Sequence, residues 1–579
     1  MAITLVKPEP ERRSAVWLDA LILVGIAAIV LGAASVAQEW RQPRNLVVDI
    51  DLSARALPKY MLYTFARAWI AYAFSLLFTI LVGSWAYYDE RARRFVLVGL
   101  DILQSLPVLA FLPVFEFALI GLFPHSNVGL ELVCVLAMFT AQVWNMTFSY
   151  YDSLRGTPAD FRMLGRLYNF NWWNRFWRVE LPFSAQSLLF NSMVSMAGGW
   201  FFLAVTEAST IGNQSYRVPG IGSYMSVAND RGDVRAIIYA IIAMSVIILV
   251  VDRLIWWPLV VWSRRFKLDD FGTGTARKSA LQLWLARSVA AQRLGLAWQR
   301  LVRRVLPAPR PPTRAGSLVP PGTPAVKRGR FNRGIYYVFL LALVALLAVG
   351  AKAVGAMLVA VHAAAWREIL CDAGLSFMRV LASVLIGTLW TVPFGVWIGL
   401  NPKLSQRFQP LIQYAASFPA PMIYPALLLL VLAVGGSLQW GAVLLILFGT
   451  QWYILFNVVG AAAAIPNDII CCAEILHLSG WRRWWKFLIP AVLPGLVTGW
   501  ITAAGGAWNA TIVSEIITVH NHTYEATGLG AYISHASDAG DFSRLTAASM
   551  VMALIVVVVN RTVWKRIQAV AIERCRFIT

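Results

Sequence analysis

Two basic, aromatic segments of this chain share residue types at the same spacing. Ser479–Pro490 reads SGWRRWWKFLIP, and Asn171–Pro182, 308 positions upstream, reads NWWNRFWRVELP. The corresponding residues are Trp173 and Trp481, Arg175 and Arg483, Trp177 and Trp485, Arg178 and Lys486, and Pro182 and Pro490. Trp and Arg are common at membrane surfaces, so one copy alone would indicate an interfacial segment. Two copies favour a stiff helix, entered through a turn at Gly480 in the second copy, that docks in a partner's groove.

The composition places these segments in a membrane protein. Of the 579 residues, 59% are hydrophobic and only 14% are charged, against about 25% charged residues in soluble proteins. The net charge of +21 is explained by basic loops between membrane spans, so we expect no nucleic-acid partner. The five cysteines form no CxxC, and His520 and His522 would supply only two ligands. We therefore expect no metal site.

Twelve hydrophobic runs approach the length of about 20 residues that a transmembrane helix needs. Six lie in each half of the chain: 16–37, 60–87, 95–123, 130–150, 183–206 and 236–261, then 335–361, 377–400, 411–434, 440–460, 491–514 and 546–563. Proline removes a helix hydrogen bond, so the runs that contain Pro107, Pro113, Pro419, Pro421 and Pro425 should be broken or kinked. The fold class is predicted to be an all-α polytopic membrane protein. Because arginines gather in alternate loops, both aromatic segments and both termini are predicted to be cytoplasmic.

The chain contains an internal repeat. At an offset of 312, Arg67 corresponds to Arg379, and at 308, Glu207 corresponds to Glu515. Each half has an even number of spans, which predicts parallel halves related by an axis along the membrane normal. The predicted domains are residues 1–262 (core 60–262), a basic, proline-rich linker 263–333, and residues 334–579 (core 371–572). An amphipathic stretch at 280–305 would be either a helix on the inner leaflet or a solvated linker helix.

Ionisable and polar residues inside the spans are candidates for function, because burying a charge in a membrane costs at least ~2.5 kcal/mol. Arg67 and Arg379 would attract an anion to a pore mouth or snorkel to headgroups. Glu207 and Glu515 would instead hold glycine-rich loops in place, through the loop glycines Gly220, Gly222, Gly528 and Gly530. Residues that could line a translocation path are Gln142, Trp144, Asn145, Gln451, Trp452 and Asn509, together with the two arginines.

The second aromatic segment and its surroundings resemble the coupling loop of ABC importer permeases, which has the form EAA, three residues, Gly, and later a hydrophobic residue and Pro. Ser376–Gly435 and Ile512–Ile533 look like the nitrate, sulfonate and bicarbonate (taurine-type) permeases, here in a duplicated, fused form. The chain departs from the motif at two points. The coupling-loop glycine is replaced by Asn169 and His477, and the EAA positions read Met163-Leu164-Gly165 and Cys471-Cys472-Ala473.

The resemblance implies a bacterial inner-membrane permease that is not itself an enzyme. Two separate ABC ATPase subunits would bind ATP and Mg²⁺, since this chain has no GxxxxGK[ST] motif. An extracytoplasmic binding protein would deliver a small oxyanion such as nitrate, a sulfonate or bicarbonate. The alternatives are a secondary transporter with parallel repeats, driven by an ion gradient, and a membrane scaffold. A secondary transporter would need charged residues or broken helices near mid-membrane in both halves. A membrane scaffold would have no need for a pair of basic, aromatic segments.

Overall fold

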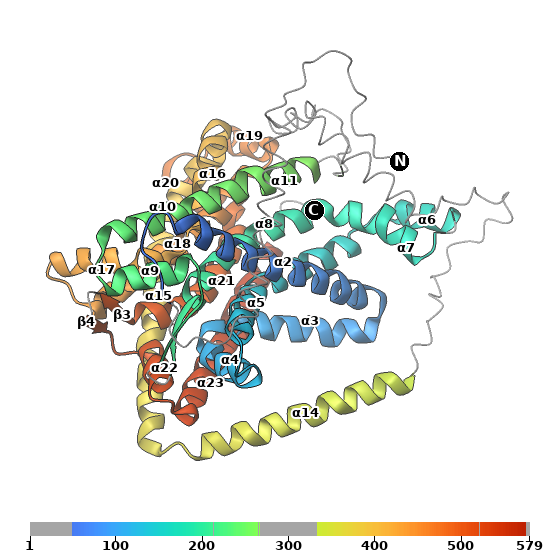
Figure 1. Cartoon of the computed structure of the whole chain (residues 1–579). Helices are drawn as coiled ribbons and strands as arrows, with labels where there is room; N and C mark the ends of the chain where they lie inside the picture. Colours follow the sequence, from blue (N-terminus) through green and yellow to red (C-terminus); the bar gives the residue numbers. More distant parts are fainter. Residues whose placement is uncertain are drawn as a thin grey trace, which may run out of the picture.

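The computed structural model describes residues 49–168, 170–211, 214–263, 266, 333–519 and 522–574 (Figure 1). Within these residues the chain is almost entirely helical. The predicted first span at 16–37, the amphipathic stretch at 280–305 and most of the linker lie outside the described residues.

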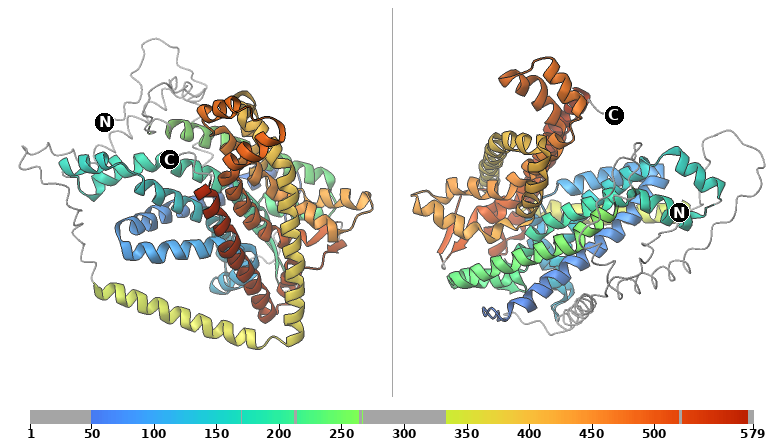
Figure 2. Two further views of the ribbon diagram at one scale, coloured as in Figure 1. Left: turned by 180° about the vertical axis from the view of Figure 1, so that it is seen from behind. Right: turned by 90° about the horizontal axis from the view of Figure 1, so that it is seen from above.

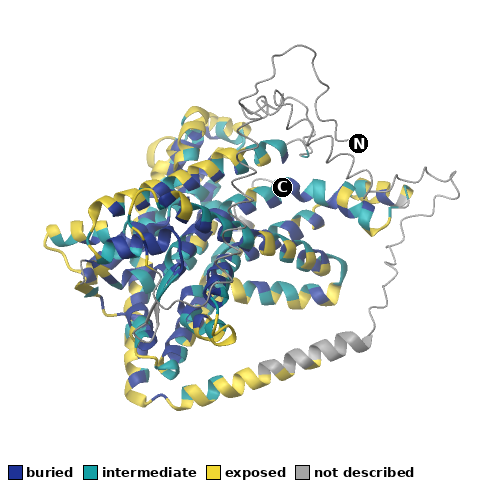
Figure 3. Cartoon of the chain, in the orientation of Figure 1, coloured by how far each residue is buried: buried dark blue, intermediate teal, exposed yellow. Residues whose placement is uncertain are grey.

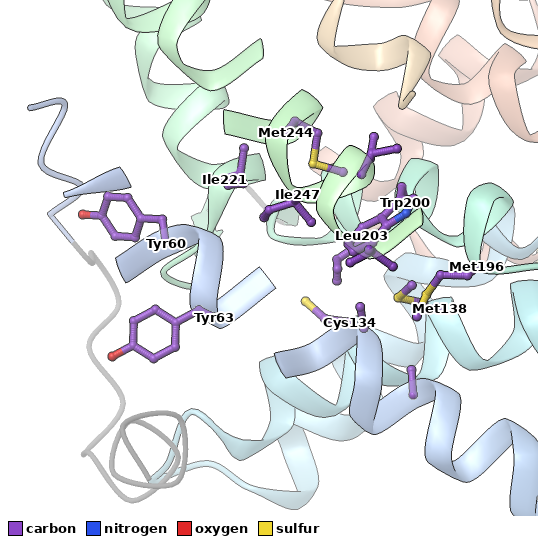
Figure 4. Close-up of a cluster of buried hydrophobic side chains, with 14 of the residues drawn as sticks. Tyr60, Tyr63, Cys134, Met138, Met196, Trp200, Leu203, Ile221, Met244 and Ile247 are labelled. Carbon is purple, nitrogen blue, oxygen red and sulfur yellow. The ribbon is translucent and has the colours of Figure 1, made fainter. Parts of the chain in front are cut away.

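The first half is built around helix α5 (Val128–Arg155), which packs between α2 (Leu57–Tyr88) and α8 (Leu181–Thr206). α9 (Ile221–Asp230) and α10 (Val234–Val251) complete this bundle. Figure 4 shows its core, in which side chains of α5, α8, α9 and α10 converge, among them Cys134, Met138, Trp200, Leu203, Ile221 and Met244. These residues are apolar and nearly all of their surface is buried, so hydrophobic contact holds the four helices together.

The second half repeats this arrangement. α18 (Leu438–Ala463) packs between α15 (Ala363–Leu400) and α21 (Ile489–Ser514), and α22 (Leu529–Asp538) precedes α23 (Phe542–Val559). The repeat extends to the turn before the last helix. Gly232 and Gly540 both have φ of 66°, and the next residue, Asp233 or Asp541, caps α10 or α23 with its carboxylate. A left-handed glycine followed by an acidic N-cap ends one helix and begins the next.

Each half also has a broken span at the predicted prolines. α3 (Glu90–Ser105) and α4 (Val108–Leu122) meet at an angle of 97° next to Pro107. In the second half, α16 (Pro402–Ser417), the 3-10 turn η4 (Ala420–Met422) and α17 (Tyr424–Ala433) replace one continuous helix. The prediction of broken helices in these segments is confirmed.

Each broken span packs against its own half and also contacts the other half. α4 packs against α21 and α23, and α16 and η4 pack against α8. The Ser549 hydroxyl donates to the Ala110 carbonyl at 2.7 Å, and the Tyr414 hydroxyl donates to Ser245 Oγ at 2.6 Å. The two halves are therefore joined through each other's broken spans.

Short strands follow α8 and α21. β1 (Ala208–Ile211) pairs with β2 (Gln214–Arg217), and β3 (Ile516–Val519) pairs with β4 (His522–Glu525), both antiparallel. These hairpins are the exception to an otherwise all-α polytopic membrane protein, and the sequence analysis did not predict them. β3 packs against α9 of the other half, where the Asn229 amide donates to the Thr518 carbonyl.

The described residues contain eight helices long and apolar enough to cross a membrane, or nine if α3 and α4 form one span. The predicted number of twelve is not reproduced. Run 16–37 is outside the described residues, and run 411–434 is divided between α16, η4 and α17. Run 335–361 forms α14 (Arg333–Val359), which extends away from the bundle in Figures 1 and 2.

The outward faces of the long helices are apolar. Exposed positions on these helices (Figure 3) include large aliphatic side chains such as Leu81, Leu254, Leu389 and Leu554. A water-soluble protein rarely exposes apolar patches of this extent. These faces are suited to contact with lipid.

Candidate functional site

Each aromatic segment is the beginning of a long membrane helix. α6 (Ala159–Leu167) is followed by α7 (Trp172–Arg175), the π-helical turn η1 (Phe176–Glu180) and α8. In the second half, α19 (Asn467–Ile475) is followed by α20 (Gly480–Arg483), η5 (Trp484–Leu488) and α21. The predicted runs 183–206 and 491–514 begin too late, because Trp172–Thr206 and Gly480–Ser514 each form one helical span of 35 residues.

The π-helical turns explain how each helix passes its proline. Pro182 and Pro490 have no N–H to donate, and in a regular α-helix their rings would clash with the carbonyl four residues earlier. Just before each proline, the N–H of Leu181 bonds the Phe176 carbonyl, and that of Ile489 bonds the Trp484 carbonyl, five residues back. The π-helical turn is wider than an α-helical turn, so the helix continues although the proline has no N–H for the usual hydrogen bond. The segment and the span therefore form one rigid unit.

The two segments present exposed aromatic and aliphatic side chains. In the second half, Trp481 is 74% exposed and Ile475 is 75% exposed, and Trp485 and Leu476 are also exposed. In the first half, the exposed large side chains are Met163, Leu164, Leu167, Trp172 and Trp177. Trp173 packs edge-on against Trp177, and Trp481 packs edge-on against Trp485. Aromatic anchors of this kind suit a protein interface.

The basic residues of the two segments are in different environments. The guanidinium of Arg175 contacts the buried carboxylate of Glu180 at 2.6 Å, and the Tyr88 hydroxyl donates to the same carboxylate. At the repeat positions Glu180 becomes Leu488, and Arg483 has no ion pair among the described residues. Arg178 lies over the Phe170 ring, and Lys486 is exposed. In the second segment, Arg482 and Lys486 are exposed and Arg483 is half-buried, and none of the three makes an ion pair within the described residues.

The turn before the second segment has a backbone conformation that favours glycine. His477 has φ of 50°, the only positive φ of a non-glycine residue in the described part of the chain. Its N–H bonds the Glu474 carbonyl, and the N–H of Leu478 bonds the Ala473 carbonyl, which is the Schellman pattern that ends a helix. Gly480 follows with φ of 53°. Asn169, the corresponding position of the first half, lies outside the described residues.

A buried ion cluster lies where α2 meets the end of α8. Arg67 contacts Glu131 at 2.5 Å and Glu207 at 2.8 Å, and all three side chains are at most 1% exposed. The same guanidinium donates to the Pro219 carbonyl, and Thr64 donates to Glu207. Such a side chain neither reaches headgroups nor faces a water-filled mouth, so the expectation of an anion-attracting or snorkelling Arg67 is corrected by these contacts.

The second half has the corresponding cluster with one charge fewer. Arg379 contacts Glu515 at 2.8 Å and the side-chain oxygen of Gln439 at 2.7 Å. Ser376 takes the place of Thr64 and donates to Glu515 at 2.6 Å. Sequence reasoning did not select Glu131, Gln439, Thr64 or Ser376. The signal was available, because these residues correspond at offsets of 308 and 312.

The two glutamates also hold the glycine-rich loops. Glu207 accepts from the N–H of Gly222 at 2.7 Å, and Glu515 accepts from the N–H of Gly530 at 2.8 Å. A Cβ on Gly220 would lie 2.3 Å from the Glu207 carboxylate, and one on Gly528 would lie 2.4 Å from that of Glu515. Close approach, not an unusual φ, requires glycine here. The loops are thereby fixed to the second span of each half.

The candidate path residues do not converge on one site. Gln142 is buried between Ser75 and Met196, and Trp144 packs edge-on against Phe78. In the second half, Trp390 donates to Gln451 and packs edge-on against Trp452. Asn509 differs from these residues because its side-chain oxygen accepts from the N–H of Leu109 in the other half, at 3.2 Å. Their role in a path stays a prediction. Within the described residues, no three His, Cys, Asp or Glu side chains are placed to hold a metal ion.

Comparison with known proteins identifies the repeat. Residues 75–257 and 391–573 each match the family described as binding-protein-dependent transport system inner membrane component. A nitrate import permease, NrtB of Leptolyngbya laminosa, is 28% identical over 32% of this chain and 64% of its own length. A bicarbonate transport system permease, CmpB of Synechocystis sp., is 30% identical over 24% of this chain and 49% of its own length.

A more distant relative is the taurine transport system permease TauC of Escherichia coli, 23% identical over 28% of this chain and 56% of its own length. The chain thus spans between about half and two-thirds of the length of these relatives. The two family matches together cover more than half of the chain. The protein therefore belongs to the family of binding-protein-dependent transport system inner membrane components and contains the family's unit twice.

Proposed function

We propose that this chain supplies both permease halves of an ATP-driven importer for a small oxyanion. Two ATPase subunits would dock on the paired segments α6–α7 and α19–α20 and would bind ATP and Mg²⁺, so the chain needs no cofactor. A substrate-binding protein would dock at the opposite face, beside the two hairpins. In this arrangement both termini and both docking segments are cytoplasmic, and the membrane is the bacterial inner membrane.

The observation that carries the proposal is the exposed aromatic surface at the start of both α8 and α21. It occurs twice, at equivalent positions, in a chain whose relatives are transport permeases for nitrate, bicarbonate and taurine. A pair of ATPases needs two such surfaces. A membrane scaffold would need no symmetric pair.

The continuity of segment and span suggests how ATP binding would move the bundle. α7 and α20, the second helix of each docking segment, continue into α8 and α21 as one helical span. α8 contacts η4 and α16 of the second half, and α21 contacts α4 of the first half. Drawing the two segments together would therefore rotate each long helix against the broken span of the other half. This reciprocal contact would let the halves rock between inward-open and outward-open states.

The test is capture of an ATPase by the detergent-purified full chain. The first variant combines Trp481→Ala with Trp485→Ala, and the second combines Met163→Ala with Leu164→Ala. Each should reduce ATPase capture and the ATP hydrolysis of the complex by at least about tenfold, because exposed anchors dominate interfaces. The matched control is Trp440→Ala, a tryptophan 80% exposed at the other end of α18, which should leave capture unchanged.

Two results would overturn the proposal. One is the absence of any co-purifying nucleotide-binding subunit when the chain is purified from its native host. The other is equal capture by the variants and the wild type. Either result, together with uptake that an ionophore abolishes, would favour the ion-gradient transporter instead.

A further inference from the structure

A glutamate lies buried in the apolar interface between the two halves. Glu116 is on α4 and is 1% exposed. Leu109, Leu112 and Leu119 are seven and four residues before it and three residues after it, so all four lie on one face of the helix. The three leucines pack in a cluster with apolar residues of α5, α8 and α21. This face of α4 is therefore enclosed by both halves.

The contacts around Glu116 lie at the end of the bundle away from the docking segments. Ser209 of β1 forms a hydrogen bond with the Glu116 carboxyl group. The next residue of α4, Phe117, packs against Phe542 at the start of α23, with ring centroids 4.6 Å apart. α4 also contacts α22, and in Figure 1 it lies beside α22 and α23, far from α7 and α20. These contacts close the interface at the end opposite the docking segments.

No charged side chain on the elements packed around α4 acts on Glu116. Its Oε1 has no hydrogen-bond partner, and it forms no ion pair, within the described residues. Glu131 and Glu207 are bound to Arg67, and α21 has no titratable residue. The remaining titratable side chains of α5, α22 and α23 are Cys134, Tyr150, Tyr151, Asp152, Arg155, Tyr532, His535, Asp538 and Arg544.

This environment favours the neutral acid. An ionised carboxylate in an apolar site costs several kcal/mol unless a cation and hydrogen bonds compensate for the lost water, and Glu116 has no cation. The packed interface therefore holds the protonated carboxyl group. If the halves separated at this end, water would reach Glu116, and a hydrated glutamate releases its proton at neutral pH.

The second half shows that packing alone does not require an acid at this position. The offset of 312 that relates Pro107 to Pro419 also relates Glu116 to Leu428. Leu428 is 0% exposed and packs in an apolar cluster with Tyr424. A leucine thus fills the equivalent site, and the buried acid is particular to the first half.

We propose that Glu116 is a proton-binding site that stabilises the closed outer end of the interface. The carboxyl group keeps its proton while α4 is packed and releases it to water when the halves separate. Because closing takes up this proton, a falling pH favours the closed state and a rising pH favours the open state. The opening step rests on the proposed transport function, whereas proton binding by the packed interface does not.

Infrared spectroscopy of the full chain in lipid nanodiscs tests for the bound proton without any ATPase. A protonated carboxyl group has a carbonyl band that a carboxylate lacks, and the band shifts in D₂O. At about pH 7, where a hydrated glutamate is ionised, the wild type should show a band of this kind that Glu116→Gln loses. The control Glu90→Gln, which removes a carboxylate that is 69% exposed, should retain it. Identical spectra of the wild type and Glu116→Gln would overturn the proposal.

Spin labels on the two halves test the effect of the proton. One label is placed at His125→Cys, in the exposed loop after α4, and the other at Ala539→Cys, exposed after α22, in a chain whose native cysteines are replaced by serine. Between about pH 5 and about pH 9, the ratio of separated to closed label pairs should rise at least about tenfold, because a tenfold difference in proton affinity between two states shifts their equilibrium by up to that factor.

Two variants should remove this response. Glu116→Gln copies the neutral acid and Glu116→Leu copies the second half, so both should keep the labels close at every pH, while Glu90→Gln should respond like the wild type. Size-exclusion profiles and unfolding temperatures establish that the variants are folded. The same pH response in the wild type and both Glu116 variants, or no response in the wild type, would contradict the proposed role of the proton.

Failure of this proposal and failure of the importer proposal give different results. Glu116→Gln should still capture an ATPase, because Glu116 is not part of the docking surface. Absence of ATPase capture by the wild type would contradict the importer and leave the infrared band intact. Absence of the band, with capture retained, would contradict only the proton site.

Discussion

Replacing Glu131 with glutamine would give the first ion cluster the composition of the second. Arg67 lies between two buried carboxylates, whereas Arg379 lies between Glu515 and the amide of Gln439. The first cluster therefore has one carboxylate more than it has cations, in a site almost without solvent. Glu131→Gln removes that excess and keeps an oxygen that can accept from the guanidinium.

The expected change in the free energy of unfolding is the balance between charge attraction and the cost of burying charges. Opposite charges about 4 Å apart attract by about 4 kcal/mol at an effective dielectric of 20, and the cost of desolvating each ion is of similar size. Glu131→Gln loses one attraction, one repulsion and one buried charge, so it should change the free energy of unfolding by no more than about 1 kcal/mol. Arg67→Met leaves both carboxylates buried without a cation. Breaking a buried pair in this way costs about 3–5 kcal/mol.

Thermal unfolding of the purified chain in detergent, followed by tryptophan fluorescence, measures this difference. The unfolding temperature of Glu131→Gln should be close to that of the wild type, and that of Arg67→Met should be far lower. Arg379→Met leaves only one buried carboxylate without a cation, so its unfolding temperature should lie between those of Glu131→Gln and Arg67→Met. Equal unfolding temperatures for Arg67→Met and Glu131→Gln would refute the charge argument.

Three further predictions concern local geometry, and each is measured by the unfolding temperature. Gly220→Ala should destabilise the chain strongly, because the new Cβ would lie 2.3 Å from the Glu207 carboxylate. The control Gly99→Ala, with open space around it, should be neutral or stabilising, and equal effects of the two substitutions would contradict the close-approach argument. His477→Gly should be about 1 kcal/mol more stable than His477→Ala, because glycine alone relieves the left-handed φ, and identical stabilities would exclude strain at this turn. Arg175→Ala should lower the free energy of unfolding by roughly 1–3 kcal/mol, because it leaves the buried Glu180 carboxylate without its cation. Arg483→Ala should change that free energy by less than about 0.5 kcal/mol, and the reverse order of effects would disprove the asymmetry of the two segments.

Much of the architecture was readable from local sequence patterns. Apolar runs of sufficient length predicted most of the spans, and the prolines at 107 and 419 marked where helices break, because proline lacks the donor that a helix needs. The repeat predicted that Arg67 and Arg379, or Glu207 and Glu515, would share environments. The association of the glutamates with the glycine-rich loops was predicted because a carboxylate at the end of a span would repel an anion.

Other features depended on packing between distant residues. The continuity of each docking segment with its span depends on a π-helical turn that accommodates the proline, and a hydrophobic pattern does not distinguish that turn from a helix end. The contact of Arg67 with Glu131 joins residues 64 positions apart, and only the packing of α2 on α5 brings them together. The contacts of α4 and α16 with the other half have no local signal either.

By itself, the sequence determined that this is a duplicated, polytopic membrane protein with paired basic, aromatic segments, because hydrophobic length, charge bias and repeat spacing act along the chain. Only the tertiary structure decided which polar residues meet. Ser149, Ser187 and Asn191 are ordinary polar residues in sequence, and they hydrogen-bond to one another because α5 and α8 pack side by side. In the second half, Gly495 and Gly499 take the positions of Ser187 and Asn191, and the absence of their side chains lets α21 approach the backbone of α18 closely.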